Sequence, residues 1–254
     1  MRLLRGELRK LIKRPATRTT FLLLAAAIVL IYVALGVSAL ALPAEQVRTD
    51  LAPLLSFPEA YRGLVSLFPL FGGLALAIYA GLVIGSEWSW GTLRLAFTRG
   101  ESRSRYVLTS FVAIAVLGAL GLVLLFAVGL VAAIVAGTVA GVARGELLHA
   151  ETLRWLPLGL LAAWFGMVVI ASLAYAVSLV TRSQVAGIGL VVALFFAEQF
   201  AGILVPPEIL RFAPLSAASG MVAADGPLVF AIAAGYLVAV LLVGSLVIER
   251  AEIT

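Results

Sequence analysis

Long apolar runs separated by short polar segments dominate this sequence. A bilayer core about 30 Å thick is crossed by about 20 helical residues, and lipid offers no partners for backbone polar groups, so each run must be helical. The pattern therefore predicts an all-α integral membrane protein forming a single transmembrane domain over residues 1–254. The six predicted spans cover residues 20–42, 64–84, 106–142, 156–180, 185–205 and 228–248.

The third run, residues 106–142, is longer than one span needs and too short for two spans with a turn. It either tilts, projects beyond the membrane, or breaks near Gly137 and Gly141. A count of five or seven spans is the alternative to six. The first run is much longer than the apolar part of a signal peptide, about 7–15 residues, so we expect it to remain as a span.

The distribution of Lys and Arg predicts the orientation. With the N-terminus inside, the inner segments hold thirteen of the 18 basic residues, most of them before residue 20 and between residues 94 and 105. Inner loops of membrane proteins carry an excess of Lys and Arg. We therefore expect a multi-pass protein of the cell (cytoplasmic) membrane with both termini in the cytoplasm.

Composition agrees with lipid as the main solvent. The chain is 63% hydrophobic and 12% charged, with a mean hydropathy of +1.15, against about 45–50% apolar residues in soluble domains. The net charge of +5 lies on no polar domain that could carry a nucleic-acid site, so we expect no nucleic-acid partner. The absence of cysteine excludes disulfides and thiolate chemistry.

Residues 1–19 form a basic amphipathic segment. Leu4, Leu8, Leu11 and Ile12 recur at helical spacing with basic residues between them, and Pro15 is expected to end or kink the helix. Such a helix before a span is typical of an interfacial helix on the cytoplasmic leaflet, in contact with membrane lipid. A simple topology anchor is the other interpretation, and the two are compatible.

The connection between the fifth and sixth spans begins with Pro206 and Pro207 and continues as a mostly small and apolar stretch. It predicts either a short re-entrant helical hairpin in the outer leaflet or a surface loop. Backbone that re-enters the bilayer persists only where protein covers it.

Catalytic and metal-binding patterns are missing from the sequence. His149 is the only histidine and falls in a predicted outer loop, which leaves no typical zinc site. No phosphate-binding G-x-x-x-x-G-K-[ST] loop is present, so any ATP must be bound by another chain. We expect no enzyme activity, no metal and no cofactor in this chain.

Glu198 is the only carboxylate clearly inside a predicted span, and Gln199 lies beside it. A charge at mid-membrane costs about 2.5–3.5 kcal/mol on insertion scales, which the surrounding apolar residues offset. Two interpretations stay open: a substrate-cavity or helix-contact residue, or a protonated or snorkelling carboxylate near the outer interface.

The predicted cytoplasmic loop, residues 85–105, mixes charges with aromatic and apolar residues. Trp88 and Trp90 fit the interfacial aromatic belt. Leu93 and Phe97 lie four apart on one face of a possible short helix, which could insert into a groove on a partner. The alternative is a positively charged loop that only fixes the topology.

This loop resembles that of the permease subunits of ATP-binding cassette (ABC) transporters of the type-2 (exporter) class. The resemblance rests on Glu87, on the Gly91-Thr92 pair and on Ser102-Arg103 before the next span. The six spans, the basic N-terminal helix and the proline-bearing hairpin agree with it. The chain departs from many relatives, which have a proline before Ser-Arg where this sequence reads Gly100-Glu101.

The resemblance implies an ATP-driven permease that exports a hydrophobic or amphipathic substrate. Two permease copies, or two related permeases, would form the pore on two separate ATPase subunits that bind Mg-ATP. The loop would be the coupling helix that docks on the ATPase. The residues that the resemblance assigns to coupling are Glu87, Gly91, Thr92, Leu93, Arg94, Phe97 and Arg103.

Two other classes remain as alternatives. An ATP-independent secondary transporter or channel would need several ionisable groups inside the membrane, where this chain offers only Glu198. A membrane scaffold or intramembrane enzyme is the third class, and an enzyme would need convergent Asp, His or Lys side chains near one membrane face.

Overall fold

A computed structural model describes residues 2–98, 102–143, 145–147, 149–220, 222 and 227–250. Among these residues, six helices are long and apolar enough to cross a membrane, as the sequence predicts for a multi-pass membrane protein. Arg99, Gly100 and Glu101 of the predicted coupling loop lie outside the described residues. The six helices are α2 (Pro15–Ala41), α5 to α6 (Glu59–Ser89), α8 (Arg103–Val139), α9 (Ala150–Thr181), α10 (Gln184–Leu204) and α13 (Pro227–Arg250).

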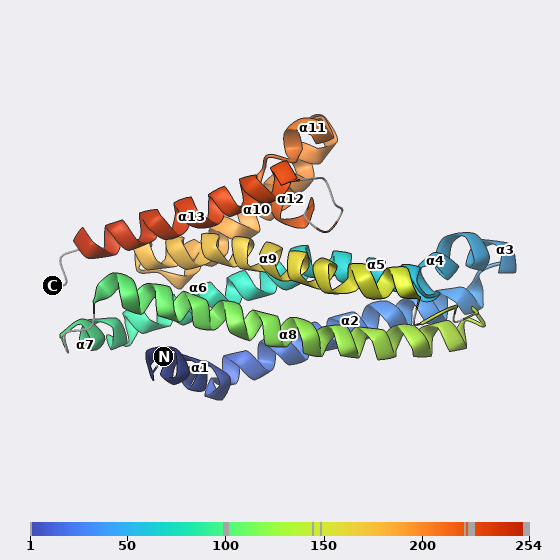
Figure 1. The fold of residues 1–254 in the computed structure, drawn as a ribbon, viewed down its shortest axis with the longest axis horizontal. Coiled ribbons are helices and arrows are strands. Elements are labelled where there is room, and N and C mark those ends of the chain that lie inside the picture. Colours follow the sequence, from blue (N-terminus) through green and yellow to red (C-terminus); the bar gives the residue numbers. More distant parts are fainter. Residues whose placement is uncertain are drawn as a thin grey trace.

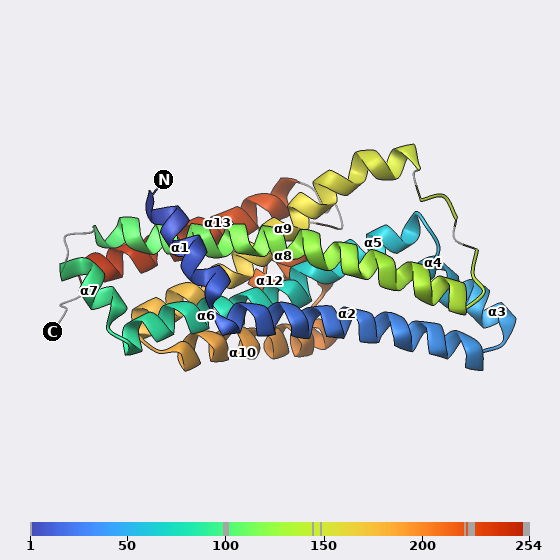
Figure 2. The ribbon, with the colours of Figure 1, turned by 90° about the horizontal axis from the view of Figure 1, so that it is seen from below.

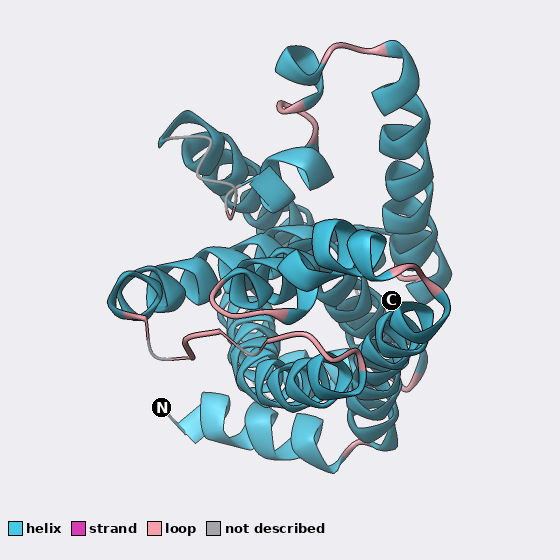
Figure 3. Ribbon diagram, turned by 90° about the vertical axis from the view of Figure 1, so that its right-hand side faces the viewer, coloured by secondary structure: helices cyan, strands magenta, loops and turns pink. Residues whose placement is uncertain are grey.

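Short helical elements connect the long helices. They are α1 (Arg2–Lys13), α3 (Ala44–Gln46), the π-helix η1 (Val47–Leu51), α4 (Ala52–Leu55), α7 (Thr92–Thr98), α11 (Pro207–Leu210) and α12 (Pro214–Gly220). The described part contains no strand beyond one isolated bridge between Phe57 and Gly145 (Figure 3).

Helices α6 and α9 form the centre of an elongated bundle. The most apolar stretch of α9 is 67% buried and that of α5 to α6 is 61% buried, whereas those of α2 and α10 are each only 11% buried. Figure 1 shows α9 running between α13 on one side and α8 on the other. The outer helices thus expose apolar side chains over most of their length, which is the distribution that a lipid solvent permits.

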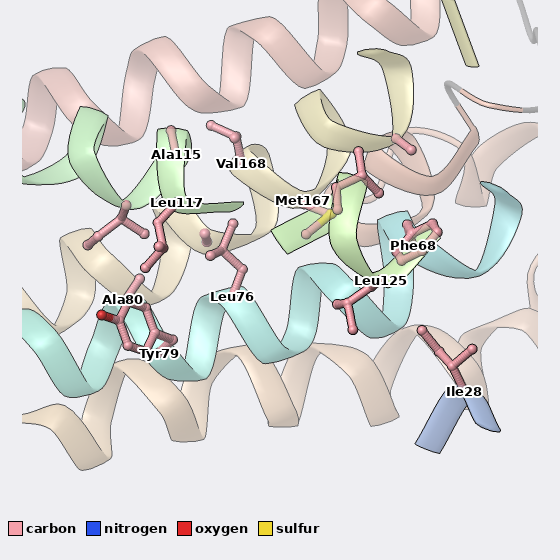
Figure 4. Close-up of a cluster of buried hydrophobic side chains, with 14 of the residues drawn as sticks. Ile28, Phe68, Leu76, Tyr79, Ala80, Ala115, Leu117, Leu125, Met167 and Val168 are labelled. Carbon is pink, nitrogen blue, oxygen red and sulfur yellow. The ribbon is translucent and has the colours of Figure 1, made fainter. Parts of the chain in front are cut away.

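The centre of the bundle is an apolar cluster contributed by α2, α6, α8 and α9. Leu76, Leu117 and Leu125 meet Met167 there (Figure 4). Beside it, Pro69 lies in the π-helix η2 (Phe68–Gly72), which joins α5 (Glu59–Leu67) to α6 (Gly73–Ser89). Proline lacks the amide hydrogen that an α-helix needs at that position, so the helix widens there without ending.

Helix α10 approaches α9 and α6 closely because glycines face its neighbours. A Cβ atom added to Gly187 would overlap Ser178 Oγ and the carbonyl oxygen of Ala174. A Cβ atom added to Gly85 would lie 2.5 Å from Gln184 Cβ. Small residues at helix interfaces are the usual means of close approach in membranes, where dispersion replaces the hydrophobic effect.

Helix α8 is one unbroken helix of 37 residues. At 1.5 Å per residue it is about 55 Å long, well beyond the bilayer core of about 30 Å. It passes through Gly137 and ends before Gly141, which has a φ of +66°. Of the three possibilities for this run, the predicted break near Gly137 and Gly141 corresponds to the end of the helix at Val139, between these two glycines, and the helix is continuous before that point.

The N-terminal segment divides into two helices. α1 ends at Lys13, and Pro15 is the first residue of α2, where its missing amide hydrogen costs nothing. The prediction that Pro15 ends or kinks the helix is confirmed as an end, but the first long helix begins at residue 15 and not at residue 20. α1 crosses the end of the bundle and packs on α8 (Figure 2).

The connection between α10 and α13 folds back on the bundle as two short helices, α11 and α12. Leu215, Ala217 and Ala218 of α12 are buried. Gly166, at the middle of α9, lies so close to Ala218 that a Cβ atom would overlap its carbonyl oxygen. Helix α12 is thus covered by protein, whereas α11 has no buried residue and Ile209 is 61% exposed.

Candidate functional site

A buried charged cluster lies at the end of the bundle that carries α1, α7 and the last turn of α13 (Figure 1). It consists of Glu7 and Lys10 of α1, Arg14 between α1 and α2, Glu87 of α6 and Tyr106 of α8. Lys10 Nζ lies 2.6 Å from Glu87 Oε1 and 2.6 Å from Glu7 Oε2. Arg14 Nη2 lies 3.3 Å from Glu87 Oε1, and the Tyr106 hydroxyl donates to Glu87 Oε2 at 3.2 Å.

The cluster is electrically balanced, which is what its burial demands. Glu87 is 0% exposed, and two carboxylates face one ammonium and one guanidinium. Burial disfavours the charged form of Lys10, but the charge of Glu87 and the bonds to Glu7 and Glu87 outweigh it and raise the pKa of Lys10 above its usual value. Lys10 therefore stays protonated at neutral pH and holds α1 to α6.

Further contacts fix α1 and the start of α2 in place. Leu11 is fully buried, and Thr17 Oγ1 donates to the Leu11 carbonyl. The Thr17 hydroxyl also lies 2.8 Å from the Tyr79 hydroxyl of α6. One face of α1 is thus part of the folded bundle, which places the helix across α8 at this end.

Trp88 links the end of α6 to the turn between α9 and α10. Its indole nitrogen donates to the Leu179 carbonyl at 3.1 Å. The Arg182 guanidinium lies 4.8 Å from the ring centroid, within the range of a cation–π contact. Arg182 itself has a φ of +57°, the left-handed conformation that ends α9.

Helix α7 begins after Gly91, whose φ of +68° suits glycine. Thr92 Oγ1 donates to the Glu87 carbonyl at 3.1 Å, so the turn is tied back to the residue that anchors the cluster. Leu93 is fully buried, and the Phe97 ring meets Tyr106 edge-on at 6.1 Å.

The prediction that Leu93 and Phe97 face a partner is therefore wrong for the isolated chain. These apolar side chains pack against the rest of the chain and hold α7 on the bundle. The exposed residues of α7 are Thr92, Leu95 and Thr98, with Leu95 51% exposed. The Arg94 side chain lies outside the described part of the structure.

Arg103, the first residue of α8, joins α7 to the last helix. Its Nη1 atom donates to the carbonyls of Ile248 and Glu249 at 3.2 and 3.1 Å. Its guanidinium also lies 5.7 Å from the Phe97 ring centroid. A cation at the carboxyl end of a helix satisfies free carbonyls and matches the helix dipole. The guanidinium thus ties three elements together.

Glu198 lies far from this end and accepts hydrogen bonds from the start of α12. The amides of Leu215 and Ser216 donate to its carboxylate at 3.0 and 2.8 Å, and the Ser216 hydroxyl donates at 2.7 Å. These bonds make Glu198 a contact between α10 and α12, which agrees with its interpretation as a substrate-cavity or helix-contact residue. Gln199 is exposed and, with Glu198, lines a small cavity of about 140 Å³ beneath the hairpin.

An apolar groove of about 660 Å³ runs between α2 and α8. Gly36 packs against Ala136 at its floor, where a Cβ atom would lie 3.4 Å from the Ala136 Cα. Val33, Val37 and Val131 are exposed along it. Its walls would hold acyl chains or other apolar groups and have almost no polar atoms for chemistry.

No group of three or more His, Asp or Glu side chains that could hold a metal is found among the residues with described positions. His149 Nδ1 lies 3.0 Å from Glu146 Oε2 in an exposed loop, as expected for a solvated residue. Most of the predicted coupling residues lie together at one end of the bundle: Glu87, Thr92, Leu93, Phe97 and Arg103. Glu198 lies away from that end.

Four members of the charged cluster were not singled out from the sequence: Glu7, Lys10, Arg14 and Tyr106. A usable signal was present, because residues 7, 10 and 14 share one helical face if the helix continues past Lys13. The partner could not be found in this way, since Glu87 lies 77 residues from Lys10.

A comparison with curated proteins finds no match to this chain. A comparison with known families finds one whose description is "Protein of unknown function", and it matches residues 48–254. The matched part begins in η1 and includes Glu87, Tyr106 and Glu198, whereas α1 and α2 precede it. Because the match spans most of the sequence, the chain belongs to the DUF2705 family.

Proposed function

We propose that this chain is the membrane-spanning permease subunit of an ABC transporter, driven by separate ATPase subunits that bind Mg-ATP. In this proposal both termini and α7 lie in the cytoplasm, and the protein resides in the cytoplasmic membrane. A second permease copy, or a related permease, completes the pore. The exported substrate is hydrophobic or amphipathic.

The observation that carries the proposal is the attachment of α7. This short helix presents Leu95 to solvent while its other face is fastened to the bundle through Leu93 and Phe97. The turn before it bonds to Glu87, whose carboxylate holds α1 and α8, and Arg103 reaches α13. A push on the exposed face of α7 would therefore reach α1, α6, α8 and α13 together.

The lack of a nucleotide-binding loop in the sequence supports a separate motor, since such a loop is the usual phosphate cradle. The apolar groove between α2 and α8 supports the substrate class, because it offers contact area without hydrogen-bonding groups. The burial of α12 against the bundle, where Glu198 accepts hydrogen bonds from its first amides, supports a re-entrant element in the outer leaflet.

The test is co-expression with the product of any ABC ATPase gene that neighbours the gene of this chain, followed by purification and measurement of ATP hydrolysis in nanodiscs. The wild-type pair is expected to co-purify and to hydrolyse ATP. Leu95→Asp places a charge on the exposed face of α7 and should abolish both, because a desolvated apolar contact would have to accept a carboxylate. Leu54→Asp is the matched control, since Leu54 is 43% exposed at the opposite end.

Failure of the wild-type chain to retain any ATPase would overturn the proposal, as would a Leu95→Asp variant that behaves like the wild type. Substrate movement driven by a proton or sodium gradient without ATP would instead establish the ATP-independent secondary transporter. Loss of the ATPase in the Leu54→Asp control would show that the binding surface lies elsewhere.

A further inference from the structure

Five basic residues between Arg5 and Arg14 divide into two sets. Lys10 and Arg14 form ion pairs inside the charged cluster, where they neutralise Glu7 and Glu87. Arg5, Arg9 and Lys13 are exposed on α1. These three residues, called here the basic stripe, form no ion pair within the described part of the chain.

The basic stripe is a line on one helical face. Its members are spaced four residues apart, so the three side chains follow one another over about 12 Å of helix at 1.5 Å per residue. Like charges four apart on a helix repel one another and destabilise it. The arrangement therefore favours an anionic partner that lies along the helix, and α1 cannot rotate away because Leu11 is buried against the bundle.

Apolar and aromatic side chains beside the stripe indicate what kind of surface this partner has. Ile12, between Arg9 and Lys13, is 51% exposed. Trp90 is 71% exposed, and the Arg14 guanidinium lies 5.6 Å from its ring centroid, which places this indole next to α1. Two turns further on, Leu22 of α2 is 69% exposed. The cations and the indole ring thus suit the headgroup layer of a membrane, and the apolar surface that follows them suits the acyl layer.

We propose that the basic stripe binds the phosphate headgroups of anionic phospholipids in the leaflet that α1 lies on. The lipid chains would lie against the exposed side chains at the start of α2. Lys10 and Arg14 take no part in this, because their charges are balanced by buried carboxylates. The proposal requires only that the chain lies in a membrane and is independent of the proposed ATP-driven function.

The experiment uses the full chain in nanodiscs of phosphatidylcholine containing a trace of photoactivatable phosphatidylglycerol. Labelled peptides are located and quantified by mass spectrometry, and a photoactivatable phosphatidylcholine serves as the neutral probe. The wild-type chain should be labelled by phosphatidylglycerol on α1 and at the start of α2, much more than by the neutral probe. High salt should reduce this labelling, because exposed charges are screened.

The variant R5Q/R9Q/K13Q should reduce labelling by phosphatidylglycerol on the order of 100-fold, at about fivefold per cation. The control R62Q/R154Q/R211Q removes three exposed arginines that lie outside α1 and α2 and should leave it unchanged. R5K/R9K keeps the charge and should retain labelling, which separates loss of charge from loss of fold.

Three results would overturn the proposal. The first is equal labelling of α1 by the anionic and neutral probes, and the second is labelling of the wild-type chain that does not respond to salt. The third is a variant R5Q/R9Q/K13Q that keeps its lipid labelling but loses a co-purifying protein, which would make the stripe a protein-binding surface.

Discussion

Removing Lys10 should harm the fold more than removing the charge of Glu87, although both belong to the same ion pairs. Lys10→Met leaves Glu7 and Glu87 with one cation between them. Glu87 keeps its contact with Arg14, but Glu7, which is only 8% exposed, loses the one ion pair that it forms in the described part of the chain, so a buried charge is left uncompensated. Breaking a buried pair in this way costs about 3–5 kcal/mol.

Glu87→Gln leaves the opposite imbalance, which the structure relieves more easily. The side chain of Arg14 is 15% exposed and can turn outward, while Lys10 keeps its partner Glu7 at 2.6 Å. The amide of the substituted side chain also offers Tyr106 an acceptor or a donor in place of the carboxylate. We expect a cost of about 1–2 kcal/mol, the size of an imperfectly replaced hydrogen-bond set.

The assay is unfolding in mild detergent, followed by the fluorescence of the 4 tryptophans, on the two single variants and the double variant K10M/E87Q. The double variant should lose less than the sum of the single losses, by at least about 1 kcal/mol, because the two residues are in direct contact. Lys13→Met is the control and should change stability by less than about 0.5 kcal/mol, since Lys13 is exposed on the same helix. Equal costs for the two single variants, or strictly additive losses, would refute the reasoning.

Three further predictions concern other parts of the molecule. Because the pKa of Lys10 is raised in the folded chain, its contribution to stability should be complete below the ordinary lysine pKa of about 10.4 and should be lost only as pH rises through the higher folded value. Unfolding measured as a function of pH should therefore show no change from this group between about pH 6 and 9. Glu198→Gln should cost about 1–3 kcal/mol and speed proteolysis or hydrogen exchange in α12, whereas the exposed Glu208→Gln should do neither. Gly187→Ala should prevent α10 from seating on α9 and lower the unfolding temperature, whereas Gly189→Ala, with nothing within 4 Å, should leave it unchanged or raise it.

The predicted site was only partly visible in the sequence. Glu87, the Gly91-Thr92 pair and Arg103 were singled out only by the resemblance of their loop to that of ABC permeases. Leu93 was assigned to the wrong side of α7. Periodicity places Leu93 and Phe97 on one face but does not say whether that face turns to the bundle or away from it. Leu93 is buried inside the chain, and Phe97 packs against Tyr106, which belongs to the neighbouring helix α8.

The apolar runs were sufficient to predict an all-α membrane protein and its six long helices. The physical reason is that lipid forbids unpaired backbone groups, so length and apolarity are enough to predict each helix without knowledge of its neighbours. Tertiary structure alone decided which polar residues meet. Glu87 and Lys10 lie 77 positions apart, and Glu198 finds its partners in α12 only because the chain folds back after Pro206. Those contacts depend on how the helices are placed beside one another. Gly187 is one of the glycines that set this spacing, and the sequence does not indicate that it packs against Ala174 and Ser178 of α9.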